Sequence, residues 1–487
     1  MALLTNLEEL NACYIDGRFM PPVNAAGAIE VWNPATGELV GRVPNGGAAE
    51  AGAAVAAAQA AFPAWARTLP ADRAVILKRW AQLMLEHAEE LARILVAEQG
   101  KPFAEAYEEA EGSALFTEWY AEEGKRAYGE TVPPSAADKR ILVIRQPVGV
   151  AALITPWNYP ATMVARKAAP ALAAGCAIVI KPSSQTPLTA VALARLAHEA
   201  GFPAGVVNLV TGRASDIGGE FMANPSVKKV SFTGSTEVGK QLIRASADQV
   251  KRLSLELGGN APFIVFPDAD LDLAVDAAVG NKFENCGQMC NGINVIYAHK
   301  EIMAAFTDRL TDRVSQLKVG SGHDPDVKLG PVIDMRSLDN VHALVTDAVE
   351  HGARVLTGGH RLTGGAYGAG SFYAPTVLAD VEQDMKLANE EIFGPVAPLI
   401  PFSDEDEVLS RVNATPYGLA AYVFTRDVRR VFEVSERLEV GMVAVNSASL
   451  SVPQAPFGGV KQSGSGREGG HFGLEEFMNI KYISITL

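Results

Sequence analysis

Cysteine is scarce in this chain of 487 residues, which contains only Cys13, Cys176, Cys286 and Cys290. Four cysteines cannot form the dense disulfide framework of a small secreted domain, so we expect a reducing compartment. No Cys-x-x-Cys occurs and no histidine cluster lies near the four thiols, so the sequence predicts no metal site.

The chain also lacks a long apolar run. The longest charge-free apolar stretch before a lysine, 168–180, is too short to span a bilayer, and the uncharged run 146–165 is interrupted by prolines. The start, 1–10, has no basic region and carries Glu8 and Glu9, so no signal peptide is predicted. We therefore expect a cytoplasmic protein without a membrane partner.

Positive charge is in the minority. The chain has 42 basic and 56 acidic side chains, which give a formal net charge of −14. This balance argues against nucleic acid or an anionic membrane as a general partner. It remains compatible with a small anionic substrate in a locally basic pocket.

What is present is a regular alternation of strand-like and helical segments. The length predicts two to four domains, and helices are expected at 48–62, 73–97 and 104–122. The many carboxylates of the third helix indicate a solvated face. Strands and helices then alternate from 148 to 257, and a second alternating region contains strands near Phe263, Val295, Val355, Val396, Ala421 and Val443. This order predicts an α/β fold with parallel sheets, whose ligands bind at the carboxyl ends of the strands.

Two glycine-containing stretches are candidates for a phosphate-binding loop. Gly464–Gly469 fits Gly-x-Gly-x-x-Gly but lacks the preceding apolar strand and the later acidic residue, so we interpret it as a decoy. Phe232–Gly239 follows a strand and opens a helix, so its free amides and the helix dipole would face an anionic pyrophosphate. An ordinary tight turn is the alternative interpretation.

The stretch Phe283–Cys290, Phe-Glu-Asn-Cys-Gly-Gln-Met-Cys, lies between a helical run and an apolar strand. A cysteine in such a loop is well placed to be a nucleophile, because a helix terminus or a nearby base can lower the pKa of its thiol. A small buried hydrophobe is the alternative for a single cysteine.

Five motifs, in order along the chain, resemble those of the aldehyde dehydrogenase superfamily. They are Pro156–Pro160 (PWNYP), Leu255–Gly259 (LELGG), Phe283–Cys290, Glu391–Pro395 (EIFGP) and Pro456–Gly459 (PFGG). The resemblance implies a Rossmann-like cofactor domain at 1–125 and 145–257, a catalytic α/β domain at 258–471, and a small β oligomerisation element at 126–144 and 472–487. It also implies a homodimer or homotetramer, with the strand-like tail pairing with a neighbouring subunit.

The same resemblance implies an activity, the oxidation of an aldehyde to its carboxylic acid with NAD(P)+. Cys290 would be the nucleophile, Glu256 the general base, and the Asn158 amide, with the Cys290 backbone N–H, the oxyanion donor. Lys181 would act at the site by reaching the adenosine ribose. The remaining expected cofactor contacts are Thr155, Pro156, Trp157, Ser183, Ser184, Gly212, Thr233, Gly234, Ser235, Leu257, Glu391 and Phe393.

Cofactor choice is expected to depend on Ser184, because many NAD-selective members carry Glu there. A carboxylate would repel a 2′-phosphate, whereas Lys181, Ser183 and Ser184 together can bind one. NADP is therefore favoured over NAD. A Cys–Glu thioesterase or esterase and a catalytically dead relative are the alternative classes; the cofactor loops argue against the first and the retained Cys290, Glu256 and Asn158 against the second.

The substrate is expected to be an acidic aldehyde, since several stretches look most like succinate-semialdehyde dehydrogenases. In that group two arginines and a serine hold the substrate carboxylate; Arg166, expected near the mouth of the site, and Ser451 match one of each. Glu284 stands where the second arginine would be, so glutarate semialdehyde or a neutral aldehyde is an alternative substrate. Gly292 replaces a redox partner cysteine, and Cys286 is interpreted as a spectator.

Overall fold

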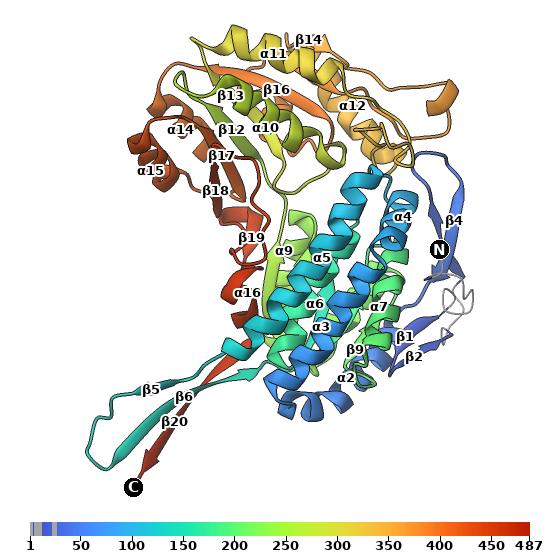
Figure 1. Ribbon diagram of the computed structural model, residues 1–487, viewed down its shortest axis with the longest axis vertical. Helices are drawn as coiled ribbons and strands as arrows, with labels where there is room; N and C mark the ends of the chain where they lie inside the picture. Colours follow the sequence, from blue (N-terminus) through green and yellow to red (C-terminus); the bar gives the residue numbers. More distant parts are fainter. Residues whose placement is uncertain (1–2, 4–11, 22–26) are drawn as a thin grey trace.

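The computed structural model describes residues 3, 12–21 and 27–487. The absence of a signal peptide is predicted from residues 1–10. Of these, only Leu3 lies within the described residues. Two α/β bodies lie one above the other and a long β arm projects from the lower one (Figure 1). None of the described helices combines the length and the hydropathy that a bilayer crossing requires.

A layer of helices covers one face of the lower body. It consists of α3 (Pro70–Glu86), α4 (Ala88–Glu98) and α5 (Phe103–Glu123), whereas α2 (Ala48–Arg67) packs mainly against the opposite face. The single helix predicted at 73–97 is wrong, because His87 leaves the helical region with φ −111° and ψ 18°. His87 thus ends α3 and begins α4, and its Nδ1 contacts Glu90 at 2.8 Å. Side-chain periodicity continues across such a break, so the sequence alone did not reveal it.

The lower body is built on an eight-stranded sheet with the order β19-β11-β10-β7-β8-β9-β1-β2. Its five central strands are parallel, as the alternating pattern predicts. The strands are β1 (Cys13–Ile15), β2 (Arg18–Met20), β7 (Val150–Ile154), β8 (Ala177–Lys181), β9 (Val207–Leu209), β10 (Val227–Thr233), β11 (Arg252–Glu256) and β19 (Gly464–Ser465). The crossovers contain α6 (Pro160–Ala174), α7 (Leu188–Ala200), α8 (Ala214–Ala223) and α9 (Thr236–Ser246). Because helices cover both faces, β8 is buried along its whole length.

The upper body contains a seven-stranded sheet with the order β14-β15-β16-β13-β12-β17-β18. These strands are β12 (Ala261–Val265), β13 (Ile293–His299), β14 (Arg354–Thr357), β15 (Thr376–Ala379), β16 (Val396–Phe402), β17 (Ala420–Phe424) and β18 (Met442–Val445). Its helices include α10 (Leu271–Phe283), α11 (Met303–Ser315), α12 (Met335–Glu350), α13 (Lys386–Asn389), α14 (Glu405–Asn413) and α15 (Val428–Arg437). All six strands predicted here are present, and β15 is the one that the sequence analysis missed.

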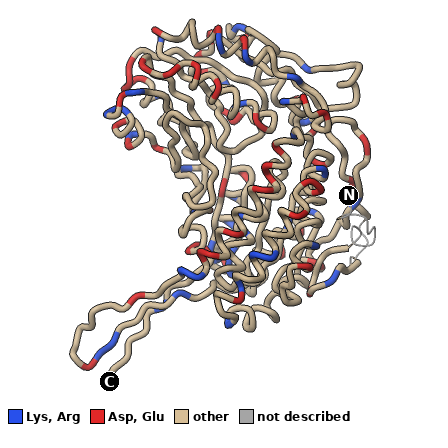
Figure 2. Tube along the Cα trace, in the orientation of Figure 1, with Lys and Arg blue, Asp and Glu red and all other residues tan. Residues whose placement is uncertain are grey.

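The arm is a three-stranded antiparallel sheet of β5 (Glu130–Val132), β6 (Lys139–Pro147) and β20 (Met478–Thr486). The tail strand therefore pairs along its length with β6 of its own chain, and its other edge carries no strand of the described residues. Most of the arm's trace is uncharged (Figure 2). We propose the predicted three-part division as the domain organisation, with β19 as a return of the 258–471 segment into the first sheet.

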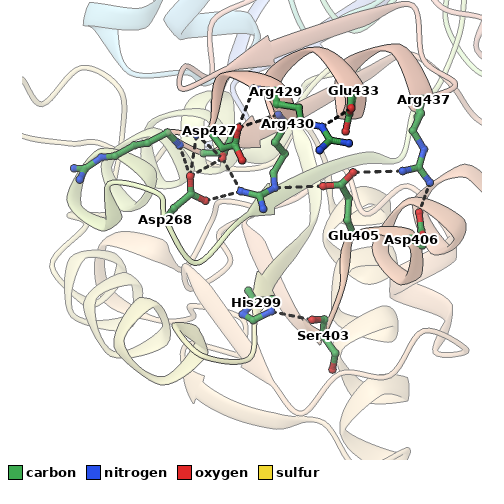
Figure 3. A network of polar contacts seen from close by, with 12 residues as sticks. Asp268, His299, Ser403, Glu405, Asp406, Asp427, Arg429, Arg430, Glu433 and Arg437 are labelled. Carbon is green, nitrogen blue, oxygen red and sulfur yellow. Dashed lines mark hydrogen bonds and ion pairs between the residues drawn. The ribbon is translucent and has the colours of Figure 1, made fainter.

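A network of charged side chains ties α14 and α15 to the loop after β12 (Figure 3). Arg430 is its centre: Nη1 donates to Asp268 Oδ1 at 2.9 Å, and Nε donates to Glu405 Oε2 at 3.3 Å. The guanidinium carbon also lies 4.5 Å from the ring centroid of Phe266. Because the Arg430 side chain is only 24% exposed, these contacts are less screened than an ordinary surface ion pair.

Replacing Arg430 by Ala is expected to destabilise the protein by about 1.5–3 kcal/mol, because it removes charged hydrogen bonds from a half-buried site. Arg429→Ala is the matched control, since that guanidinium pairs with Glu433 and its side chain is 79% exposed; it should have little effect on stability. Thermal midpoints of both variants measure the difference. Equal shifts would show that the network adds nothing beyond a surface pair.

Candidate active site

The carboxyl ends of four neighbouring strands lie at one edge of the first sheet. β7, β8, β10 and β11 end at Ile154, Lys181, Thr233 and Glu256. The residues that the sequence assigns to the cofactor follow directly: Thr155, Pro156, Trp157, Ser183, Ser184, Gly234, Ser235 and Leu257. The parallel pairing of β7 with both β8 and β10 thus assembles the predicted cofactor loops at one edge.

The polar groups at this edge fit an anionic dinucleotide. Thr155 Oγ1 is buried and has no hydrogen-bond partner among the described residues. Lys181 is 4% exposed, and burial lowers the pKa of its ammonium to about 8. Ser235 caps α9, so the first amides of that helix point toward the strand ends. An unbonded hydroxyl, a buried cation and a helix N-terminus are the groups that would bind hydroxyls and phosphates.

The Ser183–Ser184 loop is fixed by contacts with both bodies. Ser184 Oγ donates to the Gly212 carbonyl at 3.2 Å, and Gln185 Nε2 donates to Asp334 Oδ2 at 2.7 Å. Asp334 caps α12 of the upper body. The two bodies are therefore joined directly beside the loop expected to choose the cofactor.

Glu391 and Phe393 line a cavity of about 550 Å³ together with Ser337 and Asn340 of α12. Gly259 N donates to Glu391 Oε1 at 3.0 Å, and burial raises the pKa of Glu391 to about 7. The Phe393 ring lies edge-on to Trp157, with 5.4 Å between ring centroids. Two expected cofactor residues of the upper body thus face the loop after β7.

The nucleophile loop has an unusual backbone. α10 ends at Phe283, and Asn285 and Cys286 follow with φ of 49° and 57°. Side chains do not favour this region, so the conformation has to be held by other contacts. Asn285 N donates to Glu105 Oε2 at 2.8 Å, and Gln99 Nε2 donates to Asn285 Oδ1 at 2.7 Å. Cys286 itself is buried, and burial raises the pKa of its thiol, which fits a spectator.

Asn158 lies against this loop. Its Nδ2 donates to the Gln288 carbonyl at 2.9 Å, two residues before Cys290. Its own carbonyl accepts from Asn285 Nδ2 at 2.9 Å and from Lys101 Nζ at 3.0 Å. One N–H of the amide therefore holds the loop and the other is left for a second acceptor.

Two glycines allow backbone to pack closely against residues of the site. A Cβ on Gly259 would lie 2.7 Å from the Cys290 carbonyl oxygen, and a Cβ on Gly458 would lie 2.7 Å from Glu256 Oε1. Gly458 also has φ +153°, a backbone that side chains rarely adopt. The LELGG and PFGG motifs are thus explained by backbone packed against site residues.

A second buried carboxyl group, Glu468, lies beside Glu256. Lys167 donates to Glu468 Oε1, and Arg166 Nε lies 3.2 Å from Glu468 Oε2. Burial raises the pKa of Glu468, but Lys167 and Arg166 together outweigh it and hold that pKa below its usual value. Burial and the neighbouring Glu468 charge raise the pKa of Glu256 well above its usual value.

Sequence analysis missed Glu468 because it lies in the Gly464–Gly469 stretch. That stretch does not open a helix after a parallel strand; β19 pairs antiparallel with β11, so the decoy interpretation fits its geometry. The missed signal was a single acidic residue among glycines, 301 positions from its lysine partner. Only the folded chain brings the two together.

Cys290, Arg166, Glu284 and Ser451 line one cavity of about 340 Å³. The expected position of Arg166 near the mouth is wrong, because its side chain is 2% exposed. It is packed with its guanidinium carbon 3.9 Å from the Phe457 ring centroid. The cation is therefore deep in the cavity and shared with Glu468.

The carboxylates of α5 are not only a solvated face, as the sequence suggested. Glu105, Glu108 and Glu109 line the same cavity. Glu109 is buried and contacts Lys101 Nζ at 2.6 Å, and burial raises the pKa of Glu105 to about 8. Residues at every third or fourth position of α5 line the cavity. Carboxylates on a solvated helix face have the same spacing, so the sequence did not distinguish the two.

The Cys290 thiol is half-buried at the start of the loop to β13. Burial raises the pKa of Cys290 to about 12; Arg166 opposes this, whereas Glu256, Glu391 and Glu468 add to it. The thiol is thus protonated at neutral pH in the protein alone. The expected lowering of its pKa by a helix terminus or a base is not what this arrangement produces.

The site combines a cysteine and a buried carboxyl group with strand ends whose polar groups fit a dinucleotide. This combination defines a class of enzymes that join nucleophilic and redox chemistry. The chain matches the aldehyde dehydrogenase family over residues 22–483. It belongs to that family, and the thioesterase alternative is not supported.

Relatives extend over nearly the whole chain. A succinate-semialdehyde dehydrogenase [NADP(+)] of Escherichia coli K12 is 51% identical, with 97% of each chain covered. A 3-sulfolactaldehyde dehydrogenase of Pseudomonas putida is 52% identical over 97% of this chain and 96% of that one. The crystal structure of an NADP-dependent enzyme of E. coli superposes with a TM-score of 0.97 at 50% identity, covering 99% of each chain.

Alkylation of Cys290 in the protein alone is expected to accelerate about tenfold per pH unit from about pH 7 to about pH 9. Its raised pKa leaves the thiol protonated below that range, so the reactive thiolate grows with pH. Iodoacetamide labelling followed by mass spectrometry measures the rate, and Cys290→Ala is the control because the other three cysteines are buried. A rate already constant near pH 7 would contradict the raised pKa.

Proposed function

We propose that the protein oxidises a short aldehyde carrying an acidic group, such as succinate semialdehyde, to the carboxylic acid with NAD(P)+. The observation that carries this proposal is the single cavity lined by both Cys290 and the buried Arg166. A planar guanidinium is suited to a carboxylate or a sulfonate. The names of the two curated relatives, one acting on a carboxylate aldehyde and one on a sulfonate aldehyde, support the same class.

In the first half of the proposed reaction, the Cys290 thiol gives its proton to water and Sγ adds to the aldehyde carbon. The resulting thiohemiacetal oxyanion is stabilised by the free N–H of the Asn158 amide and by the Cys290 backbone N–H. The other N–H of that amide stays on the Gln288 carbonyl, which fixes the amide in place. The arrangement positions the donor before the negative charge develops.

When bound, NAD(P)+ would supply the acceptor for the hydride of the tetrahedral carbon. Thr155, Lys181, Ser184 and the α9 N-terminus would hold the adenosine and phosphate part, and Glu391 with Phe393 the nicotinamide end. Gly212, Thr233 and Gly234 border the same loops.

In the second half, Glu256 removes a proton from water as that water attacks the Cys290 thioester. The carbonyl–sulfur bond breaks, the acid is released and the thiolate returns. A carboxylate with a raised pKa is a stronger base once ionised, and the Glu468 charge supplies part of that increase.

Glu284 sets the expected limits on the substrate. It lies in the position where an arginine would strengthen carboxylate binding, so activity on succinate semialdehyde should be measurable but not optimal. Glutarate semialdehyde and neutral aliphatic or aromatic aldehydes are the alternatives. Ser451, exposed at the same cavity, would hydrogen bond to the acidic group.

We further propose a homodimer or homotetramer in the cytoplasm. The outer edge of β20 is unpaired among the described strands, and Ile480 and Tyr482 on it are 70% and 63% exposed. An exposed apolar edge strand favours pairing with another chain. The arm is therefore the proposed contact with a neighbouring subunit.

NADP is the favoured cofactor, because Ser184 carries no charge and Lys181 lies at the end of the adjacent strand. Installing Glu at position 184 should raise the KM for NADP+ at least tenfold and change that for NAD+ much less, through like-charge repulsion of the 2′-phosphate. Ser215→Glu is the matched control, since that exposed serine lies on α8. Steady-state kinetics with both cofactors measure the change, and an unchanged ratio would show that position 184 does not face the 2′ position.

Cys290→Ala should abolish aldehyde oxidation while cofactor binding persists, because only the nucleophile is removed. Glu256→Gln should give a burst of reduced cofactor followed by slow turnover, because acylation proceeds and deacylation stalls. Stopped-flow absorbance of the reduced nicotinamide with a panel of acidic and neutral aldehydes measures both. Activity of Cys290→Ala above a trace would refute the assigned nucleophile, and a lost burst in Glu256→Gln would assign Glu256 to the first half-reaction.

A further inference from the structure

Glu284 lies in the substrate cavity with one oxygen engaged and one available. Tyr159 Oη donates to Glu284 Oε1 at 2.8 Å. Within the described part of the chain, no hydrogen bond reaches Oε2. The same cavity contains Cys290 and Arg166, so Glu284 is placed to meet the far end of a bound aldehyde.

Burial is the main cause that favours the protonated form of Glu284, and neighbouring carboxyl groups add to it. Carboxyl groups of Glu105, Glu108 and Glu109 on α5 face it, and the neighbouring neutral groups are the phenols of Tyr159 and Tyr422. Lys101 is the cation that acts on Glu284 within the described residues. One ammonium cannot neutralise several converging carboxylates.

Lys101 already contacts groups other than Glu284. Its Nζ lies 2.6 Å from Glu109 Oε2 and donates to the Asn158 carbonyl at 3.0 Å. It also lies 3.8 Å from the centroid of the Tyr159 ring. Glu284 thus lies among other carboxyl groups, and burial raises the pKa of its own carboxyl group above the usual value.

A second group in the cavity indicates an anionic ligand. Arg166 is 2% exposed, and its Nη2 has no hydrogen-bond partner among the described residues. A buried, unbonded guanidinium nitrogen is suited to one oxygen of an anion. An anion bound there brings its remaining oxygens toward the other residues that line the cavity, Glu284 among them.

We propose that Glu284 binds the acidic group of the substrate as a neutral carboxylic acid, donating from Oε2 while Oε1 accepts from Tyr159. This inference rests on the proposed function, the oxidation of an acidic aldehyde. It gives Glu284 the role of a specificity-determining residue in place of an arginine. Recognition of the acid is thereby linked to pH, whereas recognition of a neutral aldehyde is not.

The test compares kcat/KM for succinate semialdehyde with that for butanal, a neutral aldehyde of equal carbon number, from about pH 6 to about pH 9. The substrate carboxylate stays ionised throughout, and any titration of Cys290 or Glu256 affects both substrates and cancels in the ratio. Since only protonated Glu284 donates, the ratio should fall as pH rises through the pKa of Glu284. Above that pKa the protonated fraction, and with it the ratio, should fall about tenfold per pH unit.

Variants of Glu284 separate the proton from the residue. Glu284→Gln donates at every pH, so its ratio should be flat; Glu284→Arg should also be flat and should exceed the wild type at high pH. Glu118→Gln, the same change on the exposed side of α5, should follow the wild type. Activity on butanal reports whether each variant is folded.

Tyr159→Phe supplies an independent measurement if position 284 does not tolerate change. The Tyr159 hydrogen bond lowers the pKa of Glu284, so removing the hydroxyl should move the fall in the ratio to higher pH. A wild-type ratio that is flat or rises with pH would overturn the inference, and so would a Glu284→Gln ratio as pH-dependent as the wild type.

The outcomes also distinguish the two proposals. If oxidation of both aldehydes requires Cys290 and the ratio is flat, the role of Glu284 is refuted and the proposed function stands. If succinate semialdehyde is not oxidised, the proposed function itself fails; if Cys290→Ala oxidises it, the assigned nucleophile is wrong.

Discussion

The arrangement of the site depends on one buried ion pair, that of Lys101 with Glu109. Glu109 Oε1 accepts from the amides of Ala161 and Thr162 at the start of α6. Lys101 donates to the Asn158 carbonyl, in the loop just before α6. A buried pair that lost one partner would leave an uncompensated charge, at a cost of about 3–5 kcal/mol. The pair therefore fixes the entry to α6, and with it the amide that faces the nucleophile loop.

The same region holds the strained backbone of the upper body. Asn285 and Cys286 lie in the left-handed region, at about 1–3 kcal/mol each. Gln99 and Glu105, from the helical layer of the lower body, hold this turn by hydrogen bonds. The hydrophobic cores of the two bodies are separate clusters, two on the faces of the first sheet and one in the upper body, so these polar contacts set how the bodies meet at Cys290.

The central strands of both sheets could be predicted from the sequence, because buried parallel strands are apolar along their whole length. β7, β8 and β13 fall where continuous apolar segments predicted them. The sequence motifs also placed Cys290, Arg166, Glu284 and Ser451 in one cavity. The roles of these residues stay predictions, as do the domain boundaries.

Most of the errors share a cause: the deciding contact forms only in the folded chain. Local sequence does not show that Glu109 meets Lys101, eight residues away, inside the protein, or that Glu468 reaches Lys167. It places Arg166 near the site but not behind Phe457, where packing buries it. The break at His87 depends on backbone angles that helical periodicity does not record.

The pairing of β20 with β6 has a consequence for the order of events during synthesis. Residues 139–147 leave the ribosome long before residues 478–486, which complete the arm, and chains grow at about 5–20 residues per second. Until then β6 has only the short β5 beside it and offers an open edge. The partner of Lys167, 301 residues later, is also still missing. The last part of the chain therefore supplies both the strand that finishes the arm and Glu468, the carboxylate that pairs with Lys167 beside Glu256. A molecule whose arm is complete is thus also one whose site contains all of its charged groups.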